Sequence, residues 1–241
     1  MSLMKRTLAN LAGQLGYEIR RKQPQQAESV LSRVDFGTIL DVGANAGQFS
    51  SAILSVHPNA MVHAFEPIPE CFELLQCRFS GIKRFEAHSV AISDSNTSAE
   101  FEVNESSASS SLLPLDDTHK RMYPGARKTK KIRVKVMTLD SWAEGRELKG
   151  PVRLKLDVQG NEFRVLRGAS RVLHRVDYVL TEVNIGAMYK GQASFQEIHD
   201  ILYRSGLEFI DFFPEKRSPD TLLCLFGDAL FARKEGSKGI R

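Results

Sequence analysis

The stretch DVGANAGQFS, residues 41–50, joins a short apolar run to a segment whose apolar side chains recur at helical spacing. Gly43 and Gly47 permit backbone angles and close approaches that a side chain forbids, and Asn45 tolerates left-handed geometry. A strand that ends at such a turn and continues as a helix is typical of a βα unit. We therefore expect this loop to press against a bound ligand.

Beyond this unit, short β-branched runs alternate with helix-length segments, which predicts an α/β fold with a mostly parallel sheet covered on both faces. The segment from residue 161 reads as a helix with Gly168 near its middle. A final strand pair, broken at Gly227 and Asp228, has no helix between its halves and predicts an antiparallel edge. The main strands are expected at residues 38–43, 61–67, 84–92, 152–160 and 176–183, with added strands at 99–104 and 131–137.

The chain divides into an expected N-terminal helical arm over residues 1–35, one main domain over 36–235 and a tail over 236–241. A serine-rich stretch at 105–117 predicts a loop that acts as a lid over the site. The basic run at 119–137 is compatible with an anionic partner, but a solvated loop and strand edge is the commoner explanation.

Composition narrows the class of protein. The 241 residues are 26% charged and 42% hydrophobic with a net charge of +4, as in ordinary globular proteins. No apolar run approaches the roughly 20 residues of a membrane span and no secretory signal is visible, so we expect a cytoplasmic protein. Three cysteines without a CxxC pair indicate neither a disulfide framework nor a cysteine zinc site.

Two carboxylates suggest the ligand. The GxGxxG spacing of dinucleotide-binding turns is absent, and Asp41 stands where it would repel a pyrophosphate. Glu66 lies 25 residues beyond Asp41, near the spacing at which a carboxylate binds a ribose. The pattern favours S-adenosylmethionine over NAD, with the ribose at Glu66 and the aminoacid-sulfonium part near Asp41.

The chain resembles the FkbM family of S-adenosylmethionine-dependent methyltransferases in the blocks ILDVGANAGQFS, VHAFEP, VAISD, MTLDSW, LKLDVQGNEFRVLRGA, LTEVN and GDALFAR, taken in order. The resemblance implies a Rossmann-like class I methyltransferase sheet and O-methylation of a sugar or other small hydroxylated metabolite. It also implies that Asp157 faces both cofactor and substrate and that Ser89 and Ala91 lie near the adenine. The methionine part would be lined by Asp41, Gly43, Ala44, Asn45 and Gly47.

Methyl transfer to an alcohol requires alignment and removal of a proton. Asp157 and Glu182 end neighbouring expected strands, and we favour Asp157 as the base, with Glu182 orienting the acceptor hydroxyl and Asn184 assisting. Lys155 shares a face with Asp157 and is a candidate ion-pair partner. The same carboxylates with Asn184 would suit Mg²⁺, although we predict no metal.

Three further site residues carry competing interpretations. Glu162 is either a substrate contact or a helix N-terminal carboxylate that caps free amides. Tyr189 offers an aromatic face and a hydroxyl that suit a sugar ring. The histidines occupy no recognised base position, and for His88 and His119 a structural role is favoured over entry into the cleft.

Three alternatives remain open. In the first, the acceptor is a macromolecule such as RNA, protein or lipid-linked glycan, with nucleic acid disfavoured among these. In the second, the chain is a non-catalytic nucleotide-binding partner. In the third, it is an NAD-dependent oxidoreductase, which the glycine spacing argues against. The sequence leaves a homo-oligomer open.

Overall fold

The computed structural model describes residues 26–104, 111–112, 129–186, 188–189, 191–218 and 221–234. Residues 1–25 of the expected arm over 1–35 lie outside these ranges, as do most of the serine-rich loop, the first part of the basic run with His119, and the tail. Among the described residues, no helix is long and apolar enough to cross a membrane.

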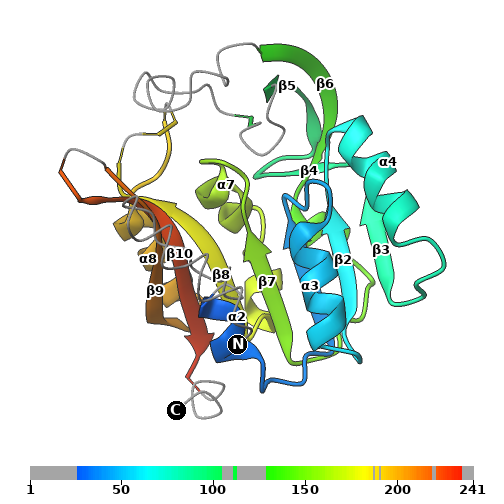
Figure 1. Ribbon diagram of the computed structural model, residues 1–241, viewed down its shortest axis with the longest axis horizontal. Coiled ribbons are helices and arrows are strands. Elements are labelled where there is room, and N and C mark those ends of the chain that lie inside the picture. Colours follow the sequence, from blue (N-terminus) through cyan, green and yellow to red (C-terminus); the bar gives the residue numbers. More distant parts are fainter. Residues whose placement is uncertain are drawn as a thin grey trace, which may run out of the picture.

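A seven-stranded sheet forms the centre of the molecule, in the order β3-β2-β1-β7-β8-β10-β9 (Figure 1). Strands β1, β2, β3, β7 and β8 run parallel, whereas β10 lies antiparallel between β8 and β9. The order reverses at β1 and β7, so the carboxyl ends of these two strands form the switch point at which ligands bind. The strands are β1 (Thr38–Val42), β2 (Met61–Phe65), β3 (Phe85–His88), β7 (Val152–Leu156), β8 (Tyr178–Asn184), β9 (Leu207–Arg217) and β10 (Cys224–Arg233).

Helices cover both faces of this sheet. One apolar core joins α2 (Gln26–Leu31), α3 (Gln48–Val56) and α4 (Pro69–Arg78) to one face. The other core lies under α6 (Leu139–Trp142), α7 (Glu162–Arg167), the 3-10 helix η3 (Val172–Arg175) and α8 (Phe195–Arg204). Strands β1, β7 and β8 are buried along their whole length, because they are covered on both faces.

A small second sheet stands at the carboxyl end of the main one (Figure 1). Its strands β4 (Ala91–Ile92), β6 (Thr129–Met137) and β5 (Thr97–Asn104) pair in that order. The pairing of β5 with β6 is antiparallel, which confirms the expected hairpin strand. The described part of the basic run is therefore a strand in which Lys131 pairs with Glu100 at 3.0 Å.

The structure confirms the mostly parallel sheet and its antiparallel edge, and it corrects three local predictions. The expected third strand is two strands, β3 and β4, in different sheets. The helix expected to have Gly168 near its middle instead ends at Arg167, with Gly168 as its C-cap. A Cβ on Gly168 would lie 2.1 Å from the Ser93 carbonyl oxygen, so only glycine fits at this close contact. Strand β10 runs unbroken through Gly227 and Asp228, and the hairpin turn lies between Arg217 and Cys224.

Candidate functional site

The loop after β1 packs tightly against the end of β7. Gly43 has a φ of 84°, and a Cβ on it would lie 1.9 Å from the Asp157 carbonyl oxygen. The backbone N–H groups of Gly43 and Ala44 both donate to the Phe65 carbonyl oxygen at 3.1 Å. Asn45 has a φ of 48°, as its tolerance of left-handed geometry predicts. The loop is thus fixed to both neighbouring strands.

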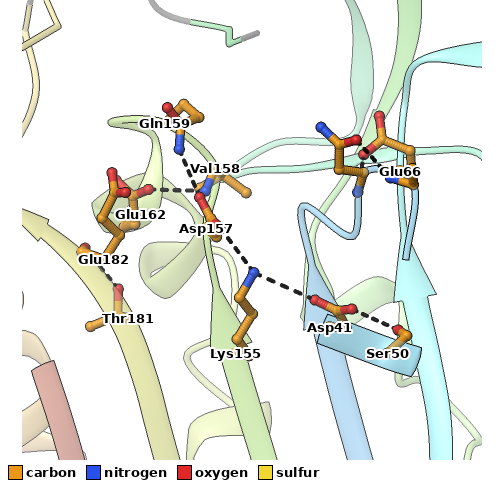
Figure 2. A network of polar contacts seen from close by, with 12 residues as sticks. Asp41, Ser50, Glu66, Lys155, Asp157, Val158, Gln159, Glu162, Thr181 and Glu182 are labelled. Carbon is orange, nitrogen blue, oxygen red and sulfur yellow. Dashed lines mark hydrogen bonds and ion pairs between the residues drawn. The ribbon is translucent and has the colours of Figure 1, made fainter. Parts of the chain in front are cut away.

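Glu66 follows β2 and lies against this loop. Its two carboxylate oxygens accept hydrogen bonds from the Asn45 and Ile68 backbone N–H groups, each at 2.8 Å (Figure 2). Burial raises the pKa of Glu66 to about 7, although the two backbone donors oppose that shift. Each oxygen keeps lone pairs for further donors, so the carboxylate is oriented to accept from a ligand's hydroxyl groups.

A cavity of about 520 Å³ opens between the loop, Glu66 and the end of β7. This is within the usual range for small-molecule sites. Its lining includes apolar side chains from the small sheet and its surroundings, among them Ile68, Ala91, Ile92 and Phe101, together with Phe49 of α3 and Glu28 of α2. The site therefore combines an apolar slot with a carboxylate at its edge.

Asn161 adds an unexpected polar group to the wall of the cavity. Its side-chain nitrogen donates to the Ile92 carbonyl oxygen and the Ser93 hydroxyl at 3.2 and 3.3 Å. Its Oδ1 is buried and has no hydrogen-bond partner among the described residues. An acceptor of this kind is costly unless a ligand donor completes it, and the exocyclic amine of an adenine is such a donor.

Lys155 connects the ends of β1 and β7. Its ammonium lies 3.1 Å from Asp157 and 3.7 Å from Asp41 (Figure 2), which confirms the expected pairing with Asp157. Burial lowers the pKa of Lys155, but the charges of Asp157 and Asp41 together outweigh it and raise the pKa above the ordinary value. Lys155 is therefore a permanent cation beneath the site.

Asp157 is the carboxylate that reaches the cavity from β7. Its side chain is 40% exposed, and it accepts from Lys155 and from the Gln159 side-chain nitrogen, the latter at 2.7 Å. Gln159 in turn accepts from the Tyr189 hydroxyl. The turn itself is held by Glu162, whose Oε1 accepts from the Val158 and Gly160 N–H groups at 3.0 and 3.2 Å.

Glu162 thus caps backbone amides, as the second of its two interpretations predicts, and burial raises its pKa to about 7. Glu182 lies behind Asp157 and accepts from the Asn184 side-chain nitrogen at 3.3 Å. Burial, and then the charges of Asp157 and Glu162, raise the pKa of Glu182 well above its ordinary value. These groups surround the base candidate without lining the cavity.

Six of the predicted site residues line the cavity: Gly43, Ala44, Asn45, Glu66, Ala91 and Asp157. Four other predicted ligand contacts do not line it. Asp41 is fully buried with its carboxylate accepting from the Ser50 hydroxyl at 2.7 Å, and Gly47 faces Leu75 and Phe79 of the α4 segment. Ser89 is exposed outside the cavity, and the Tyr189 ring is buried against Gly160.

The prediction missed Asn161, Gln159 and Phe49. Asn161 and Gln159 lie within the DVQGNE block that follows β7, so their position in the sequence was a usable signal. Phe49 looked like an ordinary core residue of α3, because its helical spacing is the same as that of Ile53, and only the cavity distinguishes it.

Strand order and site together define a class of protein. A sheet reversing at β1, a glycine loop at that reversal and a ribose-type carboxylate after β2 are the features of a class I methyltransferase fold. The buried acceptor of Asn161 and the apolar slot fit an adenosine, so the residues present suit S-adenosylmethionine.

Comparison with known proteins agrees with this class. The model of the methyltransferase FkbM domain matches residues 41–209, and the chain belongs to this family of S-adenosylmethionine-dependent methyltransferases. It is 28% identical over 208 residues to the 2-O-methyltransferase NoeI of Sinorhizobium fredii, covering 84% of each chain. It is 29% identical over 150 residues to the hexuronic acid methyltransferase AglP of Haloferax volcanii, covering 61% of this chain and 55% of the relative.

Among solved structures, a TehB-like methyltransferase from Corynebacterium glutamicum aligns with 96% of this chain and 97% of its own, at 12% identity and a TM-score of 0.46. A precorrin-6y C5,15-methyltransferase from Geobacter metallireducens aligns with 90% of each chain, at 10% identity and a TM-score of 0.47.

Proposed function

We propose that this enzyme methylates a hydroxyl group of a saccharide or a similar small hydroxylated acceptor, with Asp157 as the general base. The observation that carries the proposal is the position of Asp157. Its carboxylate ends β7 at the switch point, reaches the cavity and is held from below by Lys155.

The cofactor would be held by the residues around the cavity. Glu66 would accept the ribose hydroxyl groups, the loop from Gly43 to Asn45 would face the methionine part, and Asn161 would accept from the adenine amine. Ala91 and its apolar neighbours would cover the base. When bound, S-adenosylmethionine supplies an electrophilic methyl group.

The protein must then orient the acceptor and take its proton. Lys155 and Gln159 each donate to Asp157 at hydrogen-bonding distance, so the carboxylate is fixed while both oxygens keep lone pairs for the acceptor. Glu182 and Asn184 lie one layer behind it. We propose that Glu182 and Asn184 set the polarity around the base. For Tyr189 to contact the substrate, its ring would have to move away from Gly160.

The names of the relatives support a saccharide acceptor, since one is a 2-O-methyltransferase and another a hexuronic acid methyltransferase. Four carboxylates whose charges interact with Asp157 add a physical constraint: Glu162, Glu182, Glu215 and Asp228. A neutral polyhydroxylated acceptor meets less electrostatic opposition there than a polyanion does.

The test is methyl transfer from labelled cofactor to pooled hydroxylated acceptors, with Asp157→Asn as the variant. We expect turnover to fall by about 100-fold or more, since general-base catalysis contributes that much. Binding of S-adenosylhomocysteine, measured by thermal shift, should persist. Unchanged turnover in Asp157→Asn would remove the base assignment, and undetectable turnover in the unmutated protein across the acceptors would favour a non-catalytic binding role.

A macromolecular acceptor remains the alternative, because of the basic run at residues 119–137. Binding to RNA would weaken steeply with added salt, since lysine and arginine contacts release counterions. We expect turnover on small acceptors to change little between low and moderate salt, and activity that needs RNA and collapses with salt would replace the saccharide proposal.

A further inference from the structure

The edge of the main sheet farthest from β9 carries a cluster of two histidines and a glutamate. In the β2–β3 pairing, His63 stands opposite Glu86, and His88 follows Glu86 by two residues. Side chains two apart on a strand share a face, so all three project from the same side of the sheet. They lie on the face covered by Trp142 of α6.

Their polar atoms converge on one point. His63 Nδ1 lies 3.2 Å from Glu86 Oε2 and 3.4 Å from His88 Nε2. One ligand atom from each residue can be chosen so that all three lie within 4.8 Å of one another. Bonds of about 2.0–2.1 Å at tetrahedral angles place neighbouring zinc ligands about 3.3–3.4 Å apart. The two short separations match that geometry.

One proton on His63 Nδ1 cannot serve both of the short contacts of that atom. His63 Nδ1 is one atom, and it faces a carboxylate oxygen, which only accepts, and an imidazole nitrogen. If Nδ1 carries a proton, Glu86 and His88 compete for it; if it does not, it opposes the carboxylate. Histidine side chains are mostly neutral near pH 7, so each ring holds a lone pair that can bind a metal.

The rings are fixed by aromatic packing. Trp142 meets His63 and His88 edge-on, at centroid distances of 4.9 and 5.4 Å, and Phe65 stacks on His88 at 4.9 Å. The Glu86 side chain is 43% exposed, so solvent reaches the cluster from that side. The ligand atoms are thus preorganised, with one open direction.

We propose that His63, Glu86 and His88 bind a divalent transition-metal ion, with two imidazole nitrogens, one carboxylate oxygen and a water as ligands. This ligand set suits Zn²⁺ among the available metals. The site is separate from the cofactor cavity, which none of the three residues lines.

Such an ion would link β2 to β3 close to the cofactor wall. The His88 carbonyl oxygen accepts from the N–H groups of Glu66 and Val90, each at 3.0 Å, and both of those residues line the cavity. Fixing the two strands would therefore restrict the wall that would hold the ribose and adenine. The ion would act as a structural link, since it lies outside the reacting centre.

The test uses chelator-treated, full-length protein titrated with ZnCl₂ by calorimetry and thermal shift. We expect one ion per chain and a higher melting temperature. Glu86→Gln and His88→Gln should each weaken binding by at least about 10-fold, the lower limit for losing even an outer-shell partner. Glu100→Gln, which removes an exposed carboxylate on β5, is the matched control and should bind as the unmutated chain does.

Cobalt distinguishes this site from cysteine sites elsewhere in the chain. Co²⁺ in a tetrahedral nitrogen and oxygen site gives visible d–d bands without thiolate charge transfer, and these bands should disappear in Glu86→Gln. Absence of zinc binding, or zinc binding equal in Glu86→Gln, His88→Gln and Glu100→Gln, would overturn the proposal. A thiolate band that survives both cluster variants would place the metal at cysteine instead.

Arg146 provides a variant that leaves every ligand in place. Its positive charge acts on both His63 and His88, and its guanidinium lies 5.1 Å from the Trp142 ring centroid. A nearby cation opposes a bound dication. Arg146→Gln should therefore tighten zinc binding measurably, and weaker binding in this variant would contradict a metal at the cluster.

Discussion

At the level of one side chain, Glu66 is expected to make cofactor binding depend on pH. Its pKa is about 7 in the folded protein and near 4.5 in an unfolded chain, chiefly because of burial. Ionised Glu66 is the better acceptor for ribose hydroxyl groups. The affinity for S-adenosylhomocysteine should therefore rise as the pH increases through about 7, measured by calorimetry between about pH 6 and pH 8.

Glu66→Gln should lower that affinity by about 10–100-fold at pH 8 and flatten its pH dependence, since a hydrogen bond to a charged group is worth about 1.5–3 kcal/mol. Burial also raises the pKa of Asp228 to about 7, but Asp228 lies off the cavity. Asp228→Asn is therefore the control. If affinity no longer depended on pH in this variant, Asp228 and not Glu66 would be the titrating group.

The stability of the fold should change with pH in the opposite direction to cofactor affinity. Because Glu66 binds its proton more tightly in the folded protein than in the unfolded chain, its contribution to stability is lost as the pH rises from about 4.5 to about 7.

Asn161 makes a second prediction about a single side chain. Its buried Oδ1 should accept from the adenine amine, while its nitrogen stays bonded to the Ile92 carbonyl oxygen and to Ser93. Asn161→Ala should weaken S-adenosylhomocysteine by about 10-fold or more. An analogue with inosine in place of adenosine lacks the amine, so it should bind both proteins about equally. A variant that discriminates the two ligands as well as the unmutated protein does would contradict this contact.

At the level of elements, the β1 loop depends on a close approach that only glycine allows. Gly43 and Gly81 both have positive φ, of 84° and 78°, but a Cβ would clash only at Gly43. Gly81→Ala should cost about 1–2 kcal/mol for the left-handed backbone alone. Gly43→Ala must also displace the Asp157 backbone, so its loss in urea unfolding should be clearly larger, and turnover should fall with it. Equal losses would show that the loop yields without disturbing β7.

The strands and helices themselves could be predicted, because hydrophobic periodicity and turn residues are local signals in the sequence. For example, the apolar run TILDV ends at Gly43, and a segment with apolar side chains at helical spacing follows it. The direction in which side chains point at and near the strand ends was not predictable. Asp41 turns under the loop to Ser50 and Lys155, and Tyr189 packs on Gly160, because neighbouring elements occupy the space toward the cavity. Glu66 and Asp157 could be located, since parallel strands bring their carboxyl ends together at the edge of the sheet where ligands bind. The position of the turn between β9 and β10 could not, because it depends on how the two strands pair across the sheet.

At the level of the whole molecule, a buried ion pair joins the chain before the sheet to its central strand. Arg153 of β7 is fully buried, and its guanidinium donates to the Glu28 carboxylate of α2 at 2.8 Å. It also lies 4.9 Å from the Phe49 ring centroid. Removing one partner leaves the other charge buried, so Arg153→Met should cost about 3–5 kcal/mol in urea unfolding.

The double variant Glu28→Gln with Arg153→Met should recover part of that loss, because no buried charge is left without its partner. Glu28 lines the cavity as well, so Glu28→Gln should also change S-adenosylhomocysteine affinity if α2 closes that end of the site. Strictly additive losses in the two single variants would mean that the charges are independently solvated. In that case α2 would be held by Ala27 and Leu31, which are buried in the core beside β1, and not by its charge.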